Sequence, residues 1–253
     1  MAMQEVRSRY SGSVLGIVWS FFNPLLQLAV YTFVFGYIFQ ARWGVETGDG
    51  GFAAKLEFAV ILFSGLILHS FFAECIGRAP ILMQSNANLV KRVVFPLEVL
   101  PWVAIAAALF HLAIGFVVLA IGILIVFGGI PWTAIFVVLP VLSLMLIAVG
   151  ATWFLASIGV FFRDIGQAIG PVIMILLFVS PILFPTDRLP ETFRFILLLN
   201  PLTIPVEQVR AVLLWGVMPD WLLLAKHFAV GLVVAWIGYY WFARTHKAFA
   251  DVI

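Results

Sequence analysis

Charged side chains are scarce in this sequence: Asp, Glu, Lys and Arg make up 10% of its 253 residues, against about a quarter in ordinary soluble domains. Because 64% of the residues are hydrophobic, the composition excludes an ordinary soluble domain. The formal net charge of +2 is too small to indicate nucleic-acid binding. Cys75 is the only cysteine, so no disulfide can form within the chain.

The sequence also lacks the motifs of enzymes that hydrolyse ATP, peptides or esters. No G-x-x-x-x-G-K-[ST] loop occurs, and none of the four lysines follows a glycine, so the chain cannot bind ATP in the P-loop manner. Neither G-x-S-x-G nor H-E-x-x-H occurs, and no pair of carboxylates lies within an apolar run. We therefore predict that the chain is not an enzyme and holds no metal or other cofactor of its own.

Long apolar runs are what the sequence has in abundance. Each is long enough to cross a hydrocarbon core of about 30 Å, which predicts an all-α integral membrane protein with six transmembrane helices. The predicted spans cover about 20–40, 58–77, 99–127, 132–162, 165–184 and 221–243. We expect residues 1–253 to form a single transmembrane domain.

Two shorter elements complete the predicted architecture. Met1–Tyr10 is short and basic, which predicts an interfacial helix on the cytoplasmic surface. Residues 193–216 contain two short apolar segments around Asn200-Pro201, which predicts an outer re-entrant helix pair between spans five and six. Pro205 falls in the first turn of the second helix, and Gly216 is its expected stop.

The distribution of cations indicates the orientation only weakly. Lys and Arg side chains concentrate on the cytoplasmic side of membrane proteins. The predicted inner side carries eight: Arg7, Arg9, Arg78, Lys91, Arg92, Arg163, Arg244 and Lys247. The predicted outer side carries six: Arg42, Lys55, Arg188, Arg194, Arg210 and Lys226.

Few polar side chains interrupt the apolar runs. We predict that His69 bonds to a neighbouring helix, and that Glu74 either reaches the inner membrane surface or is paired. His69 and His111 are the only ionisable candidates near mid-membrane, which argues against a proton- or sodium-coupled transporter. Pro140 is the natural kink site of the fourth run.

The polar segment Ser85–Pro101 separates the second and third spans. Helical spacing places Asn88, Lys91, Arg92 and Phe95 on one side of it, which predicts a short amphipathic helix over 86–95. Ser85 or Asn86 is its expected cap, and Pro96 its expected end. A solvated loop with basic residues near lipid headgroups fits the spacing equally well.

Short motifs punctuate nearly the whole chain. They are Arg9-Tyr10-x-x-Ser13-x-Leu15-Gly16-x-x-Trp19, Asn23-Pro24-Leu25, Tyr31-Thr32-Phe33-Val34-Phe35-Gly36, Asn86-Ala87-Asn88-Leu89-Val90-Lys91, Phe95-Pro96, Phe162-Arg163-Asp164, Ser180-Pro181-Ile182, Asn200-Pro201-Leu202-Thr203 and Ala250-Asp251-Val252-Ile253. Any one of these motifs alone is weak evidence for a family. In this order they resemble the membrane permease subunit of bacterial polysaccharide-exporting ATP-binding-cassette transporters, most closely the O-antigen exporters.

This resemblance implies that two copies of the chain and two ATP-binding subunits export a lipid-linked polysaccharide across the bacterial inner membrane. The partner subunits would bind ATP and Mg. The helix over 86–95 would couple to the ATPase through Asn86, Asn88, Leu89, Lys91, Arg92 and Phe95. Arg163 and Asp164 close the fourth span at the predicted inner face and are candidates for an inner gate or its support. The resemblance places Asn200, Pro201, Glu207 and Arg210 at the re-entrant exit.

Aromatic residues are candidates for the channel lining. Tyr31, Phe35 and Phe39 are spaced at i, i+4 and i+8 and share one helix face, and Phe178 lies in the fifth span. Sugar rings stack on aromatic faces, so such a stripe could hold a moving glycan through many weak contacts. The alternative for these residues is a lipid-facing or packed position.

Two other functions fit the same residues. One is export of teichoic acid or capsule by the same architecture. The other is a non-transporting membrane scaffold, surrounded by lipids, whose basic segment recruits a partner protein.

Overall fold

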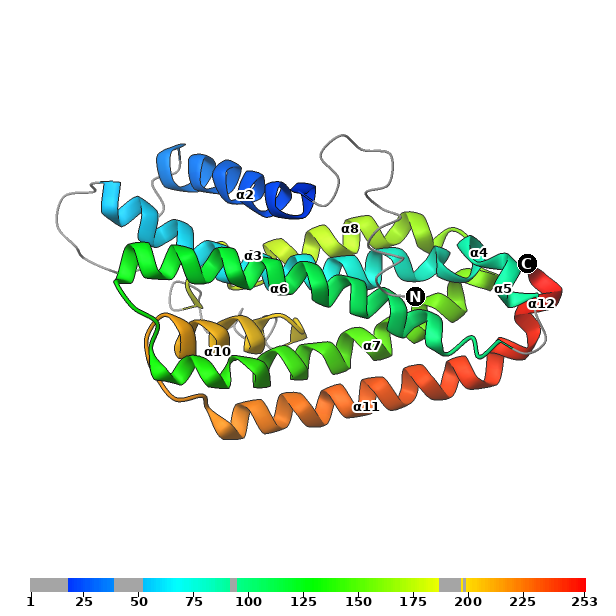
Figure 1. Cartoon of the computed structure of the whole chain (residues 1–253). Helices are drawn as coiled ribbons and strands as arrows, with labels where there is room; N and C mark the ends of the chain where they lie inside the picture. The colour runs from blue at the N-terminus through cyan, green and yellow to red at the C-terminus, as the bar shows by residue number, and fades with distance from the viewer. Residues whose placement is uncertain (1–17, 39–51, 92–94, 187–196, 198) are drawn as a thin grey trace.

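The structure is a computed structural model that describes residues 18–38, 52–91, 95–186, 197 and 199–253. These residues form helices, turns and irregular segments without any β-strand, and the long helices run side by side in an elongated bundle (Figure 1). The predicted all-α class is therefore confirmed. The predicted interfacial helix over Met1–Tyr10 lies outside the described residues.

Four helical stretches are long and apolar enough to cross a membrane, counted over the described residues: Ala53–Ser85, Val99–Phe127, Trp132–Phe161 and Trp221–Val252. Their main helices are α3 (Phe52–Arg78), α6 (Val99–Phe127), α7 (Val138–Phe161) and α11 (Trp221–Thr245). The 29 residues of α6 extend about 43 Å at 1.5 Å per residue, which exceeds the hydrocarbon core. These helices match the predicted spans 58–77, 99–127, 132–162 and 221–243.

The other two predicted spans are not among these four long apolar helices. In the first, α2 (Trp19–Tyr31) continues into a π-helical segment, η2 (Thr32–Ile38). In the fifth, α8 (Ile165–Phe178) has only 14 residues, about 21 Å, so the helix ends six residues before the predicted end of the span at Phe184. The chain leaves the helix at Val179 and Ser180, just before Pro181. Six crossings remain a prediction.

Pro140 does not kink the fourth span in the predicted way. A 3₁₀ helix, η4 (Trp132–Val137), leads directly into α7, and Pro140 is the third residue of α7. The first turn of a helix needs no amide donor, so proline fits there without breaking a hydrogen bond. The irregularity lies at the change from 3₁₀ to α geometry at Val137–Val138.

The helices α7 and α11 run along each other at very short range (Figure 1). Gly150 and Gly238 form this contact: a Cβ at Gly238 would overlap the backbone of Gly150, and a Cβ at Gly150 would overlap the backbone of Val234. On another part of α7, the buried Thr152 lies beside α3, with its hydroxyl 3.5 Å from the carbonyl of Cys75. Small residues thus let α7 approach two neighbours closely.

The short helix α10 (Thr203–Leu213) is enclosed by longer helices. It contacts α3, α7, η4 and α11, and nearly all of its side chains are buried. Pro205 lies in its first turn, and Gly216 follows it with a left-handed φ of 63°, as predicted. A helix enclosed in this way does not lie flat on the outside of the bundle.

Candidate functional site

The predicted coupling segment lies at one end of the bundle. After α3 the chain forms a 3₁₀ turn, η3 (Ala79–Ile81), and two short helices, α4 (Leu82–Ser85) and α5 (Ala87–Val90). Figure 1 shows α4 and α5 at the same end as the C-terminal helix α12 (Phe249–Val252). The loop between α7 and α8 reaches this end as well, since α8 contacts η3.

The single helix predicted over 86–95 is not present in this form. Asn86 breaks the helix between α4 and α5 with φ −114° and ψ 29°, α5 ends at Val90, and Phe95 is not helical. Asn86 occupies the N-cap position of α5, but its Nδ2 donates back to the carbonyl of Leu82 at 2.9 Å. The side chain therefore stabilises the break instead of capping the following helix.

The segment nevertheless has the predicted two-sided character. Asn88 and Lys91 are exposed, Leu89 and Phe95 are partly buried against the core, and Val90 is buried. Arg92 lies outside the described residues. The polar side of the segment is therefore available to a partner, while its apolar side is anchored in the bundle.

Two contacts fix this segment to the end of α7. Gln84 Nε2 donates to the carbonyl of Gly159 at 2.9 Å. The backbone of Pro80 lies directly against Gly159, where a Cβ would overlap it. A displacement of this segment is therefore passed directly to α7.

Other predicted site residues are only partly brought together. Arg163 and Asp164 are exposed in the turn between α7 and α8, near the coupling segment. Tyr31 is partly buried against the core, and Phe178 is 52% exposed. The side chain of Phe35 and all of Phe39 lie outside the described residues, so the aromatic lining remains a prediction.

At the predicted exit, Asn200 organises the chain before α10. Its Nδ2 donates to the carbonyl of Leu176 on α8 at 2.9 Å, and its Oδ1 accepts from the amide of Leu202 at 3.0 Å. His227 Nε2 on α11 donates to the carbonyl of Pro201 at 3.1 Å. The Asn200-Pro201 break is thus tied to two neighbouring helices.

Arg210, which was counted on the predicted outer side, lies on α10 and is buried, with 2% of its surface exposed. Its guanidinium donates to the carbonyls of Pro181 (2.5 Å), Ile182 (3.2 Å) and Ile61 (3.2 and 3.3 Å), and to Ser64 Oγ (3.2 Å). The chain after α8 is not helical, and its free carbonyls attract this buried cation. Its burial does not change the cation count, and the orientation remains a prediction.

Sequence reasoning did not identify a polar cavity between α2, α3 and α6. Its volume is about 190 Å³, and its polar lining residues are Ser20, Asn23, Gln27, Ser70, Glu74 and His111. His111 Nδ1 on α6 donates to both carboxylate oxygens of Glu74 on α3, at 2.9 and 3.1 Å. Ser70 Oγ donates to Gln27 Oε1 at 3.3 Å.

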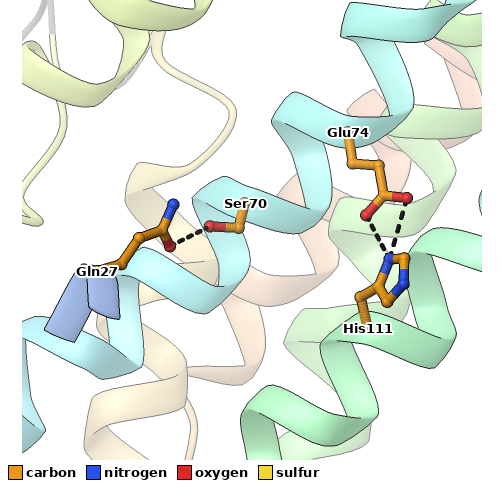
Figure 2. Close-up of polar contacts among 4 residues, drawn as sticks. All are labelled: Gln27, Ser70, Glu74 and His111. Carbon is orange, nitrogen blue, oxygen red and sulfur yellow. Dashed lines mark hydrogen bonds and ion pairs between the residues drawn. The ribbon is translucent and has the colours of Figure 1, made fainter. Parts of the chain in front are cut away.

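Figure 2 shows how α3 connects the two neighbouring helices. Ser70 and Glu74 lie one turn apart on α3, and they point towards Gln27 on α2 and His111 on α6. The signal for this arrangement was present in the sequence. Asn23 and Gln27, like Ser70 and Glu74, are spaced at i, i+4 within apolar runs, so each pair shares one helix face. Glu74 is paired, which is one of its two predicted states.

His69 lies on α3 but does not belong to the cavity lining. Its Nε2 donates to the carbonyl of Ile173 on α8 at 3.1 Å, which confirms the predicted bond to a neighbouring helix. Its role is to hold α3 against α8.

Comparison with known proteins agrees with this architecture. Residues 1–214 match the family model of the ABC-2 type transporter. The O-antigen export system permease protein RfbA of Klebsiella pneumoniae is 24% identical over 252 residues, covering 99% of this chain and 92% of the relative. RfbA of Myxococcus xanthus is 26% identical over 257 residues, covering 100% and 94%.

A relative that is named for a different polysaccharide also matches. The polysialic acid transport protein KpsM of Escherichia coli is 26% identical over 251 residues, covering 93% of this chain and 88% of the relative. The family model spans well over half of the chain, and the described residues contain several helices apolar enough to cross a membrane. This chain therefore belongs to the ABC-2 type transporter family, as a multi-pass membrane permease.

Proposed function

We propose that this chain is the permease subunit of an ATP-driven exporter that moves a lipid-linked, O-antigen-like polysaccharide across the bacterial inner membrane. In this proposal two copies of the chain form the membrane path, and two separate ATP-binding subunits bind ATP and Mg. The chain itself performs no chemistry.

The observation that carries the proposal is the end-to-end match to O-antigen export permeases. Two such relatives, from different organisms, cover 99% and 100% of this chain and are themselves covered over 92% and 94% of their length. A match of this extent includes both ends of the bundle, so it is not limited to one shared helix pair.

The coupling segment supports the requirement for a partner ATPase. Asn88 and Lys91 are exposed at one end of the bundle, and the same segment is held against α7 through Gln84 and Pro80. A subunit that binds the exposed side could therefore move α7. We propose that the ATPase binds here, with Arg92 and Phe95 completing the contact.

The exit elements fit the same proposal. Asn200, Pro201 and Arg210 hold α10 between α3, α8 and α11 through backbone carbonyls. We propose that α10 is the second half of an outer re-entrant pair beside the glycan exit, with Glu207 close to the Arg210 guanidinium. Arg163 and Asp164 would lie at the opposite, inner side.

Deleting the gene tests the proposed function directly. Lipid-linked glycan should accumulate inside the cell and disappear from the surface, and a plasmid copy should restore export. Removing the partner ATPase should give the same phenotype. Normal surface glycan in the deletion strain would contradict transport and favour the scaffold alternative, which predicts altered assembly without glycan accumulation.

Export of a capsule glycan is the second candidate, because the polysialic acid transport protein covers 93% of this chain. The two candidates differ in the charge of the cargo. Anion-exchange chromatography of the glycan that accumulates in the deletion strain would separate them: a neutral chain favours the O-antigen-like cargo, and a polyanion favours the capsule-like cargo.

A further inference from the structure

The cavity between α2, α3 and α6 lies near the middle of the length of α6, and its α2 side, with Asn23 and Gln27, is exposed. Ala113 is the middle residue of α6, 14 residues from Val99 and 14 from Phe127. His111 is two residues away, so its backbone lies about 3 Å along the axis from the helix centre. Polar and ionisable side chains at this depth are costly unless they are paired or face polar contents.

The polar groups of the cavity are not fully enclosed by protein. Glu74 and His111 pair with each other, yet their side chains remain 18% and 17% exposed. By contrast, the buried His227 on α11 is 5% exposed, with its Nδ1 2.9 Å from Ser143 Oγ. The α2–α3–α6 cavity therefore offers hydrogen-bonding groups to whatever enters it.

The chemistry of the lining selects for an uncharged, hydroxyl-rich ligand. Hydroxyl groups can donate to the Glu74 carboxylate, to amide oxygens and to Ser70 Oγ, and they can accept from the amides of Asn23 and Gln27. Among the described lining residues there is no lysine or arginine. A phosphate or carboxylate would therefore face Glu74 without a cationic partner other than His111.

The size and apolar lining also suit a single sugar ring. At about 30 Å³ for each water molecule in the liquid, 190 Å³ corresponds to the volume of about six waters. Phe63 and Phe71 also line the cavity, and aromatic side chains provide the apolar surface on which a sugar ring packs.

We propose that this cavity binds one uncharged sugar unit of the exported glycan through Glu74, His111, Gln27, Asn23 and Ser70. This inference rests on the proposed function and adds a specificity to it, because the site favours neutral over acidic glycan units. Glycerol or inositol headgroups of lipids share the same hydroxyl chemistry, so the experiment must separate the two sources.

The test compares two buried polar pairs in the full complex with its ATPase. In the variant E74L/H111L the ion pair is replaced by apolar side chains, a change that often leaves folding intact or improved. The matched control is S157A/T245A, which removes a polar pair between α7 and α11, away from the cavity and from the proposed exit. Complexes are purified from the glycan-producing host in nanodiscs without ATP, and bound hexose and bound phospholipid are quantified by mass spectrometry.

We expect E74L/H111L to retain at least tenfold less glycan than the wild type, while S157A/T245A retains a normal amount. Equal glycan in wild type and E74L/H111L would overturn the inference, and so would a loss of phospholipid with unchanged glycan. If E74L/H111L does not assemble, the variant N23L/Q27L on α2 takes its place in the same measurement. We again expect at least tenfold less bound glycan than in the wild type.

The export assay keeps this inference separate from the proposed function. If deletion of the gene abolishes export while the cavity variants bind and export normally, the glycan site is wrong and the transporter assignment stands. If deletion leaves export unchanged, the transporter assignment itself fails.

Discussion

The α7–α11 contact and the α2–α3–α6 cavity differ in what separates their helices. Between α7 and α11 the backbones touch at Gly150 and Gly238, and the polar groups nearby, such as His227, are enclosed and bonded. Between α2, α3 and α6 there is a polar space of about 190 Å³. The same membrane protein thus contains one closely packed side and one side with room for a hydrophilic guest.

This difference indicates that the two regions have different functions. Close backbone packing leaves no space for helices to move independently, so the α7–α11 side should move as one body. A polar space inside an apolar bundle is maintained only where it has a use, since it sacrifices packing contacts. The closely packed side is suited to transmitting a force, and the cavity side to contacting cargo.

The largest effect should come from breaking the closely packed side. In Gly238→Leu the new side chain would overlap the backbone of Gly150, so we expect no folded protein to survive detergent extraction. Gly170→Leu is the matched control, because nothing lies within 4 Å of a Cβ at that position. Size-exclusion chromatography would measure both, and a monodisperse Gly238→Leu protein would contradict the close packing.

Removing the enclosed cation should have the next largest effect. Arg210→Leu leaves the carbonyls of Ile61, Pro181 and Ile182 without their donor, at an expected cost of about 3–5 kcal/mol. Thermal unfolding in detergent would measure it. Arg210→Lys keeps the charge but not the forked geometry of the guanidinium, so its melting temperature should lie between those of the wild type and Arg210→Leu. A wild-type melting temperature for Arg210→Leu would mean that these bonds are not needed.

Charge reversal in the coupling segment should weaken binding of the ATPase without unfolding the permease. We expect K91E/R92E to reduce co-purification of the ATPase at least tenfold, about 1.4 kcal/mol, by repelling the groups that now attract it. Lys226→Glu, an exposed lysine on α11, is the control. If K91E/R92E co-purified with a wild-type yield of ATPase and exported normally, this segment would not be part of the ATPase-binding surface.

A small substitution on the cavity side should have the smallest effect. A Cβ at Gly115 would lie 2.9 Å from Ile67 Cγ2 and 3.3 Å from Ile67 Cβ, which are side-chain and not backbone atoms, so Gly115→Ala should cost about 1–3 kcal/mol. Gly238→Ala, which overlaps backbone, should cost more. Equal melting temperatures for the two alanine variants would remove the distinction between the two sides.

Helix positions in this chain could be predicted wherever an apolar run was long and uninterrupted. Residues 99–127 were predicted as a span and form α6, because a stretch of this length without charge has one stable state in a bilayer. The end of α8 at Phe178 was missed, because Pro181 acts together with carbonyl contacts made by Arg210 from a distant helix.

The polar contacts were harder to predict for the same reason. Glu74 and His111 are 37 positions apart, and Arg210 is 149 positions from Ile61. Each is visible in the sequence as an isolated polar residue, but its partner depends on which helices become neighbours. Of the candidate site, the two-sided character of the segment around Leu89 could be predicted, whereas its break at Asn86 could not.

The contact between Pro80 and Gly159 gives α7 the properties of a lever. At one end α7 is fixed to the segment that carries Gln84, and at the other η4 is fixed to α10 by the bond from Thr133 Oγ1 to the carbonyl of Val212, at 2.6 Å. The 24 residues of α7 between these attachments extend about 36 Å. We expect a tilt applied at the Gln84 end to be transmitted along this arm to α10, through the bond between Thr133 and Val212.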